Sequence, residues 1–173
     1  MKHPTELIYR PPMPLVIFGG VVGYIIFACT LVLTRGLSHF DYLAFLGAES
    51  GSSAEANFVR GFWLVFILGA LILPSILWVA WRKLPWEGTG LGTALLKGLL
   101  FGLVCWIVAG VTIPIFQESA AGTAGFFGLS LGIVPAALLL VACLMYGVAT
   151  VVVGMMTRGT SPIDMVGWKG LGP

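Results

Sequence analysis

Four side chains that can bind metals or transfer protons lie in one polar stretch, residues 34–60. They are His39, Asp41, Glu49 and Glu55. Imidazole and carboxylate groups are common metal ligands, but these spacings match no zinc or calcium pattern. The stretch is also rich in Gly and Ser, which is typical of a loop. The pattern therefore favours solvated loop charges over a metal site.

Histidine content also limits which cofactors the chain can hold. A haem between membrane helices generally needs paired axial ligands such as histidine. The chain contains only His3, near its start, and His39. We therefore expect that it binds no bis-histidine haem by itself, and we expect no cofactor.

The potential nucleophiles lie in apolar surroundings. Cys29, Cys105 and Cys143 all fall in apolar runs, where a thiol behaves as a small hydrophobic group. No nucleophile stands beside a base, and no glycine-rich loop of the phosphate-binding type is present. The sequence thus predicts no catalytic, cofactor-binding or metal-binding residue, and it argues against an autonomous enzyme.

The composition is that of a protein with several membrane spans. Hydrophobic residues make up 58% of the 173 residues and charged residues only 9%, and the mean hydropathy is +1.02. A soluble domain of this size needs far more charge on its surface. A net charge of +2 is too small to suggest nucleic acid binding.

The longest uncharged run lies between Glu118 and Arg158. A membrane span needs about 20 apolar residues, so the run holds either one long helix or two short ones divided at Pro135. No polar turn surrounds Pro135, and this favours one helix over residues 126–156 that Pro135 kinks. Leu139 is expected to face lipid.

Together these features predict an all-α membrane protein with a bundle of four transmembrane helices over residues 14–157. Residues 1–13 and 158–173 are expected to be tails, the second of them extended. A short interfacial helix is predicted around residues 37–45, with Ser38 as its cap, followed by a loop over 47–57. Lys97 is expected to reach the membrane surface as an anchor. The predicted spans are residues 14–33, 61–81, 95–116 and 126–156.

Glycines spaced one helical turn apart recur in the predicted spans. Small residues let two helix backbones approach closely in lipid, so these glycines are predicted to form helix-packing faces. They are Gly19, Gly23, Gly98, Gly102, Gly110, Gly128 and Gly132.

Polar side chains at membrane depth are few and uncharged. They are expected to bond to helix carbonyls or to bridge helices, rather than to line a substrate path. They are Thr30, Ser75, Thr112, Ser130, Tyr146 and Thr150.

The basic residues predict the orientation, because short loops rich in Lys and Arg remain in the cytoplasm. An arrangement with both termini inside places seven basic residues on the cytoplasmic side and only Arg35 and Arg60 outside. We therefore expect a multi-pass protein of the inner (plasma) membrane. The seven are Lys2, Arg10, Arg82, Lys83, Lys97, Arg158 and Lys169.

The C-terminal tail combines apolar residues with glycine and proline. Trp168 and Pro162 suit docking into a groove of another subunit, where a buried aromatic side chain contributes strongly to binding. The alternative is that Trp168 rests among lipid headgroups.

The last apolar run resembles the final helix of small uncharacterised four-helix bacterial membrane proteins, some of which accompany haem–copper oxidases and related respiratory complexes. Gly128, Gly132, the pair Tyr146-Gly147 and Gly154 carry this resemblance, which covers about a fifth of the chain. It implies no catalytic residues and favours an accessory subunit.

The expected function is therefore a non-catalytic accessory subunit of an energy-converting, respiratory electron-transfer complex in the membrane. Its glycine-rich helix faces are expected to pack against a neighbouring subunit that carries a cofactor. The expected partners are the lipid bilayer and other integral membrane subunits. One alternative is a small oligomeric transporter or channel that uses kinks at Pro74, Pro114 and Pro135. Another is a quinone- or lipid-binding component, with a pocket formed by Trp106, Met145 and Tyr146 together with a second chain.

Overall fold

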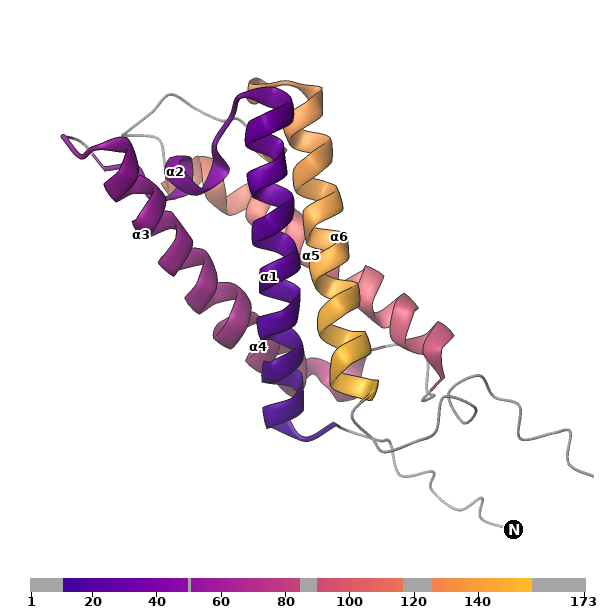
Figure 1. The fold of residues 1–173 in the computed structure, drawn as a ribbon. Helices are drawn as coiled ribbons and strands as arrows, with labels where there is room; N and C mark the ends of the chain where they lie inside the picture. The colour runs from indigo at the N-terminus through magenta and orange to yellow at the C-terminus, as the bar shows by residue number, and fades with distance from the viewer. Residues whose placement is uncertain (1–10, 50, 85–89, 117–125, 157–173) are drawn as a thin grey trace, which may run out of the picture.

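The computed structural model describes residues 11–49, 51–84, 90–116 and 126–156, and these are folded almost entirely into helices (Figure 1). Within this part of the chain, four helical segments are long and apolar enough to cross a membrane. The prediction of four such segments is thus confirmed, while their bounds differ from those expected. The four segments are Met13–Ser38, Ala54–Lys83, Leu91–Thr112 and Ile133–Met155.

The first helix, α1 (Met13–Ser38), has Pro14 in its first turn as predicted, but it extends past the predicted end at residue 33. Hydroxyl groups explain this extension. Thr34 Oγ1 donates to the carbonyl of Thr30 and Ser38 Oγ to that of Thr34, so these polar side chains are satisfied inside the helix. The helix ends where His39 adopts a left-handed conformation, with φ 57°.

A short helix in the first connection is confirmed as α2 (Tyr42–Leu46), but Ser38 does not cap it. Asp41 does, because its carboxylate accepts a hydrogen bond from the Ala44 N–H at 3.0 Å. Tyr42, Leu43 and Phe45 are buried. The helix therefore packs against the other helices along one side.

The second segment begins earlier than predicted, at Ala54, and the preceding loop is correspondingly shorter. Ser53 caps the start by accepting from the Ala56 N–H at 3.2 Å. The segment is continuous through four pieces, with a π-helix just before Pro74. They are α3 (Ala54–Phe66), η1 (Ile67–Ile72), α4 (Leu73–Ala80) and η2 (Trp81–Lys83).

The third helix, α5 (Leu91–Phe116), begins four residues before its predicted start. Lys97 therefore lies in the second turn of the helix and not near its end. The side chain is only 5% exposed, and its ammonium lies 4.9 Å from the ring centroid of Trp81. Lys97 is therefore packed against Trp81 and is not an exposed side chain at the end of its helix, as the anchor role had assumed.

The fourth apolar run forms one long helix as predicted, but α6 (Ile133–Met156) begins seven residues after the predicted start. Residues 126–131 instead form a short helical turn, η3 (Phe126–Leu131). Positive φ angles at Phe127, Gly128 and Gly132 prevent η3 and α6 from forming one continuous helix. Pro135 consequently lies in the first turn of α6, where its missing N–H removes no helix hydrogen bond, and it does not kink a longer helix.

The arrangement centres on α1 and α6, which run antiparallel side by side (Figure 1). The segment α3–α4 packs against α1 and diverges from it toward α2, while α5 packs against α6 (Figure 1). One hydrophobic cluster includes Trp81 and Phe101, and the other includes Tyr42 and Leu139. Leu139 is only 3% exposed, so the expectation that it faces lipid is wrong.

Candidate functional site

An open cleft of about 520 Å³ lies between α1 and α3, beside α2. Apolar and aromatic side chains line it, and they come from all three helices. From α1 these are Tyr24, Ile25, Ala28, Cys29, Val32 and Leu33. Leu43 of α2 and Phe58 and Phe62 of α3 complete the wall.

Two close backbone contacts hold α2 and the loop after it against α3, beside the cleft. A β-carbon at Gly61 of α3 would collide with the carbonyl of Leu43, and one at Gly47 would collide with the carbonyl of Asn57. The backbone of α2 and of the loop after it therefore rests directly on α3. At the other end of the cleft the Tyr24 hydroxyl donates to the Phe62 carbonyl at 3.3 Å, which ties α1 to α3.

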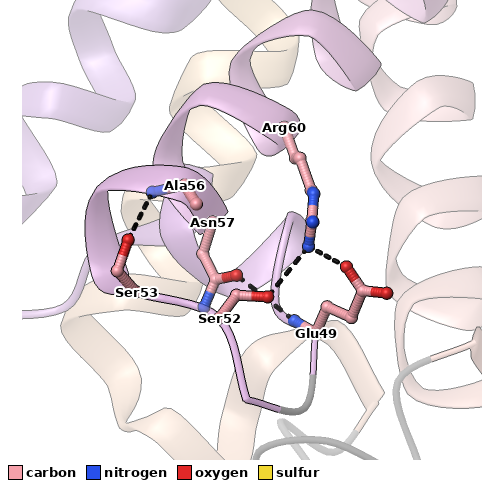
Figure 2. Close-up of polar contacts among 6 residues, drawn as sticks. All are labelled: Glu49, Ser52, Ser53, Ala56, Asn57 and Arg60. Atoms are coloured by element: carbon pink, nitrogen blue, oxygen red, sulfur yellow. Dashed lines mark hydrogen bonds and ion pairs between the residues drawn. The ribbon is translucent and has the colours of Figure 1, made fainter.

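The loop beside the cleft is held by polar contacts at the start of α3 (Figure 2). Arg60 forms an ion pair with Glu49 and donates to Ser52 Oγ at 3.0 Å. Asn57 Oδ1 accepts from the Glu49 N–H at 3.3 Å. These contacts fix Glu49 to α3, although both charged side chains remain at least half exposed.

The four loop residues considered as metal ligands are not brought together. Asp41 pairs with Arg35 at 3.4 Å and Glu49 pairs with Arg60, so these two carboxylates have separate cationic partners. Among the described residues, no three His, Cys, Asp or Glu side chains are placed to share a metal ion.

A second polar feature lies where α6 meets the π-helix. At the end of η1, the N–H of Leu73 donates to the carbonyl of Leu68, so this N–H is not available to the carbonyl of Gly69. The next possible donor to the Gly69 carbonyl is position 74, and proline has no N–H. The Tyr146 hydroxyl supplies the missing donor at 2.7 Å. This bond satisfies a carbonyl that the helix itself leaves unpaired.

Most of the other polar side chains in the predicted spans form hydrogen bonds within their own helices, as predicted. The side chains of Thr30, Ser75, Thr112 and Thr150 each donate to a carbonyl one turn earlier. Tyr146 bridges two helices.

Two buried donors in the described part of the chain lack an acceptor, Tyr42 Oη and Trp106 Nε1. Both border the Phe127-Gly128 turn. The rings of Trp106 and Phe127 lie 4.5 Å apart, and a β-carbon at Gly128 would lie 3.0 Å from Tyr42 Oη. Burial, and secondarily Cys143, raises the pKa of Tyr42 to about 12, so the phenol is neutral at physiological pH.

The glycines predicted to pack helices in the first and third spans face other elements of this chain. Gly19 and Gly23 lie against the α6 backbone at Thr150 and Tyr146. Gly102 lies against Cys143, where an added β-carbon would be 2.5 Å from the carbonyl oxygen. Gly98 meets α6 at Val148 and Gly147, and Gly110 meets the ring of Phe127.

Gly128 and Gly132 do not lie on a helix face. Their φ angles are +72° and +108°, a region that side chains disfavour. Both residues are therefore required for the turn that precedes α6. The prediction that they form one packing surface is wrong because it assumed that the helix already runs through them.

Other close contacts at glycines were not predicted from the sequence. A β-carbon at Gly147 of α6 would collide with the backbone of Gly98 and Gly102 of α5, and one at Gly20 would collide with the ring of Pro74. Gly147 had one visible signal, since it is small and lies in a long apolar run. Gly47 and Gly61 had no such signal, because Gly47 was predicted to begin a loop and Gly61 was the first residue of the predicted second span.

The three residues considered as a quinone pocket point to different places. Met145 is half exposed and its neighbour Tyr146 is only 3% exposed. Tyr146 is bonded to Gly69, while Trp106 stacks on Phe127. The predicted docking residues Pro162 and Trp168 lie outside the described residues.

Comparisons of the chain with family models, with curated proteins and with solved structures gave no match.

Proposed function

We propose that this chain is a multi-pass protein of the inner membrane, with both termini in the cytoplasm, and that it is a non-catalytic accessory subunit of an energy-converting complex. The observation that carries the proposal is the apolar outer surface of the helices. Val79 is 68% exposed and Phe18 55% exposed. Such side chains need lipid or neighbouring membrane helices around them.

The packing between the helices supports a structural role over a transport role. The backbones of α1 and α5 approach α6 so closely at Gly23, Gly98 and Gly102 that a single β-carbon would collide there. These contacts leave no room for a substrate between the paired helices. Of the prolines proposed as functional breaks, Pro135 lies in a first turn, so it does not interrupt its helix.

These glycines pack against helices of the same chain, so we propose that other surfaces contact the other integral membrane subunits. The exposed apolar side chains of α4 and α5 provide one such surface. Trp168 and Pro162 of the C-terminal tail provide the second, by docking into a groove of a neighbouring subunit at the cytoplasmic face.

Purification of the tagged chain from its native membrane in a mild detergent tests the proposal. Mass spectrometry and a visible spectrum should reveal co-purifying subunits that carry haem or copper. Deletion of residues 160–173 should leave insertion unchanged and reduce co-purification. A chain that purifies alone from intact membranes would contradict the subunit assignment, and undiminished co-purification after the deletion would contradict docking by the tail.

A further inference from the structure

The length and position of the cleft between α1 and α3 match one leaflet of a bilayer. On α1 its lining runs from Tyr24 to Leu33, and nine steps along a helix cover about 14 Å. Half of a hydrocarbon core is about 15 Å. Tyr24 lies near the middle of α1, Met13–Ser38, and Leu33 lies near its end. The cleft therefore runs from the membrane midplane to one surface.

The volume of the cleft favours a narrow ligand over a partner helix. A helix about 10 Å across fills about 400 Å³ per turn, so a cleft of about 520 Å³ accepts little more than one turn of a partner helix. A single hydrocarbon chain is narrow enough to lie along its whole length. The wall is apolar, and the one hydroxyl beside it, on Tyr24, already donates to Phe62.

We propose that this cleft binds one acyl chain of a membrane phospholipid whose headgroup lies at the Arg35 end. The inference rests on the proposed membrane location of the chain. It does not depend on which complex the chain joins.

The charges at the open end favour a zwitterionic headgroup with an amine. Arg35 follows Ala28 by seven residues, two helical turns, so both lie on the same side of α1. Its side chain pairs with Asp41 at 3.4 Å but is still 67% exposed, so it can contact a phosphate as well. A guanidinium is well suited to a phosphate. Glu55 precedes Phe58 by three residues on α3 and has no ion pair among the described residues.

The net charge at this end of the cleft also favours a zwitterionic headgroup with an amine. Residues 34–60 carry one more acidic than basic side chain, which disfavours an anionic lipid and attracts an ammonium group. An ethanolamine phospholipid meets both conditions, with its phosphate at Arg35 and its amine toward Glu55. The acidic residues are Asp41, Glu49 and Glu55, and the basic residues are Arg35 and Arg60.

Native mass spectrometry of the full chain in mild detergent tests the occupant. The chain is incubated with equal amounts of phosphatidylethanolamine, phosphatidylglycerol and an isoprenoid quinone. We expect one retained phosphatidylethanolamine per chain. Val32→Trp fills the cleft and should abolish retention. Val108→Trp on α5 is the matched control and should not, because Val108 is 50% exposed, like Val32 at 53%, and lies outside the cleft. Cys29→Phe is a second filling variant in case Val32→Trp does not fold.

A second pair of variants tests the headgroup. Arg35→Gln should reduce retention, whereas Arg60→Gln should not. Arg60 binds both Glu49 and Ser52 (Figure 2), whereas Arg35 pairs with Asp41 at 3.4 Å and is more exposed. Preferential retention of the quinone or of phosphatidylglycerol would overturn the proposal, as would equal retention by Val32→Trp and Val108→Trp. A folded chain that is extracted from membranes but retains no phospholipid refutes this site alone. A chain absent from the membrane fraction refutes the proposed function.

Discussion

The hydroxyl group of Tyr146 shows how one side chain can stabilise an irregular helix. Pro74 and the π-helix before it leave the Gly69 carbonyl without a backbone donor, and Tyr146 Oη supplies one at 2.7 Å. Water is scarce at this depth, so an unpaired carbonyl is costly. The Tyr24 bond to Phe62 is longer, at 3.3 Å, and its acceptor lies inside the α-helix α3.

We predict that Tyr146→Phe lowers the free energy of unfolding by about 1–2 kcal/mol, because the Gly69 carbonyl loses the hydroxyl donor that replaces a helix N–H. Tyr24→Phe is the matched control and should cost less than about 0.6 kcal/mol. Thermal unfolding in detergent micelles measures both. Equal losses in the two variants would show that the Gly69 carbonyl finds another donor.

Gly132 has a conformation that other residues rarely adopt, with φ +108°. Gly132→Ala should therefore destabilise the chain by about 1–3 kcal/mol. Gly36 is the control, because a β-carbon there meets nothing within 4 Å and the residue lies in α1. Gly36→Ala should stabilise the helix by about 0.5–1 kcal/mol. The unfolding midpoints of the two variants should move in opposite directions, and a neutral Gly132→Ala would contradict the turn before α6.

At the scale of elements, α5 and α6 are held together by contact between backbones. Gly98 and Gly102 of α5 face Gly147 and Cys143 of α6 with no side chain between them. Dispersion forces between closely packed backbones stabilise helix pairs in lipid, where the hydrophobic effect between helices is absent. The contact therefore depends on the size of the residues there and not on their hydrophobicity.

We predict that Gly102→Leu separates α5 from α6 and costs about 1–3 kcal/mol, the usual range for overpacking. Gly92→Leu tests the same change in the first turn of α5, where a β-carbon meets nothing within 4 Å. It should be neutral or slightly stabilising, because leucine favours helix by about 0.8 kcal/mol over glycine. Unfolding in micelles and the yield of folded protein distinguish the two. Similar behaviour of both leucine variants would argue against the close approach at Gly102.

At the scale of the whole molecule, four membrane-crossing segments would return the chain to the side from which it started. The loop with the ion pairs of Arg35 and Arg60 then faces one side and both termini face the other. For this proposed topology, the positive-inside rule predicts that the termini lie in the cytoplasm.

Cysteine labelling in intact cells tests this topology. In a chain whose native cysteines are replaced by alanine, Ser52→Cys should react with an impermeant reagent from outside. Gly170→Cys should react only after the membrane is opened. Labelling of both positions from the same side would refute the arrangement.

Features that depend on composition and on local pattern could be predicted from the sequence. The scarcity of charge predicted the long apolar helices, and Pro14 marked the first turn of α1 because its φ angle suits that position. The spacing of Gly19 and Gly23, and of Gly98 and Gly102, identified positions where the structure places another backbone. These signals were readable because each acts within a few turns of one helix.

Features that depend on contacts between distant parts of the chain could not be predicted from the sequence. Leu139 is as apolar as a lipid-facing residue, and only the packing of α6 against its neighbours buries it. Lys97 is buried because the ring of Trp81, from another helix, covers it. The cleft likewise is formed by residues of three helices that are distant in the sequence, and close contacts at Gly47 and Gly61 hold α2 against α3 beside it. Hydrophobicity is a property of each residue, whereas the side that a residue faces depends on which helices lie beside it.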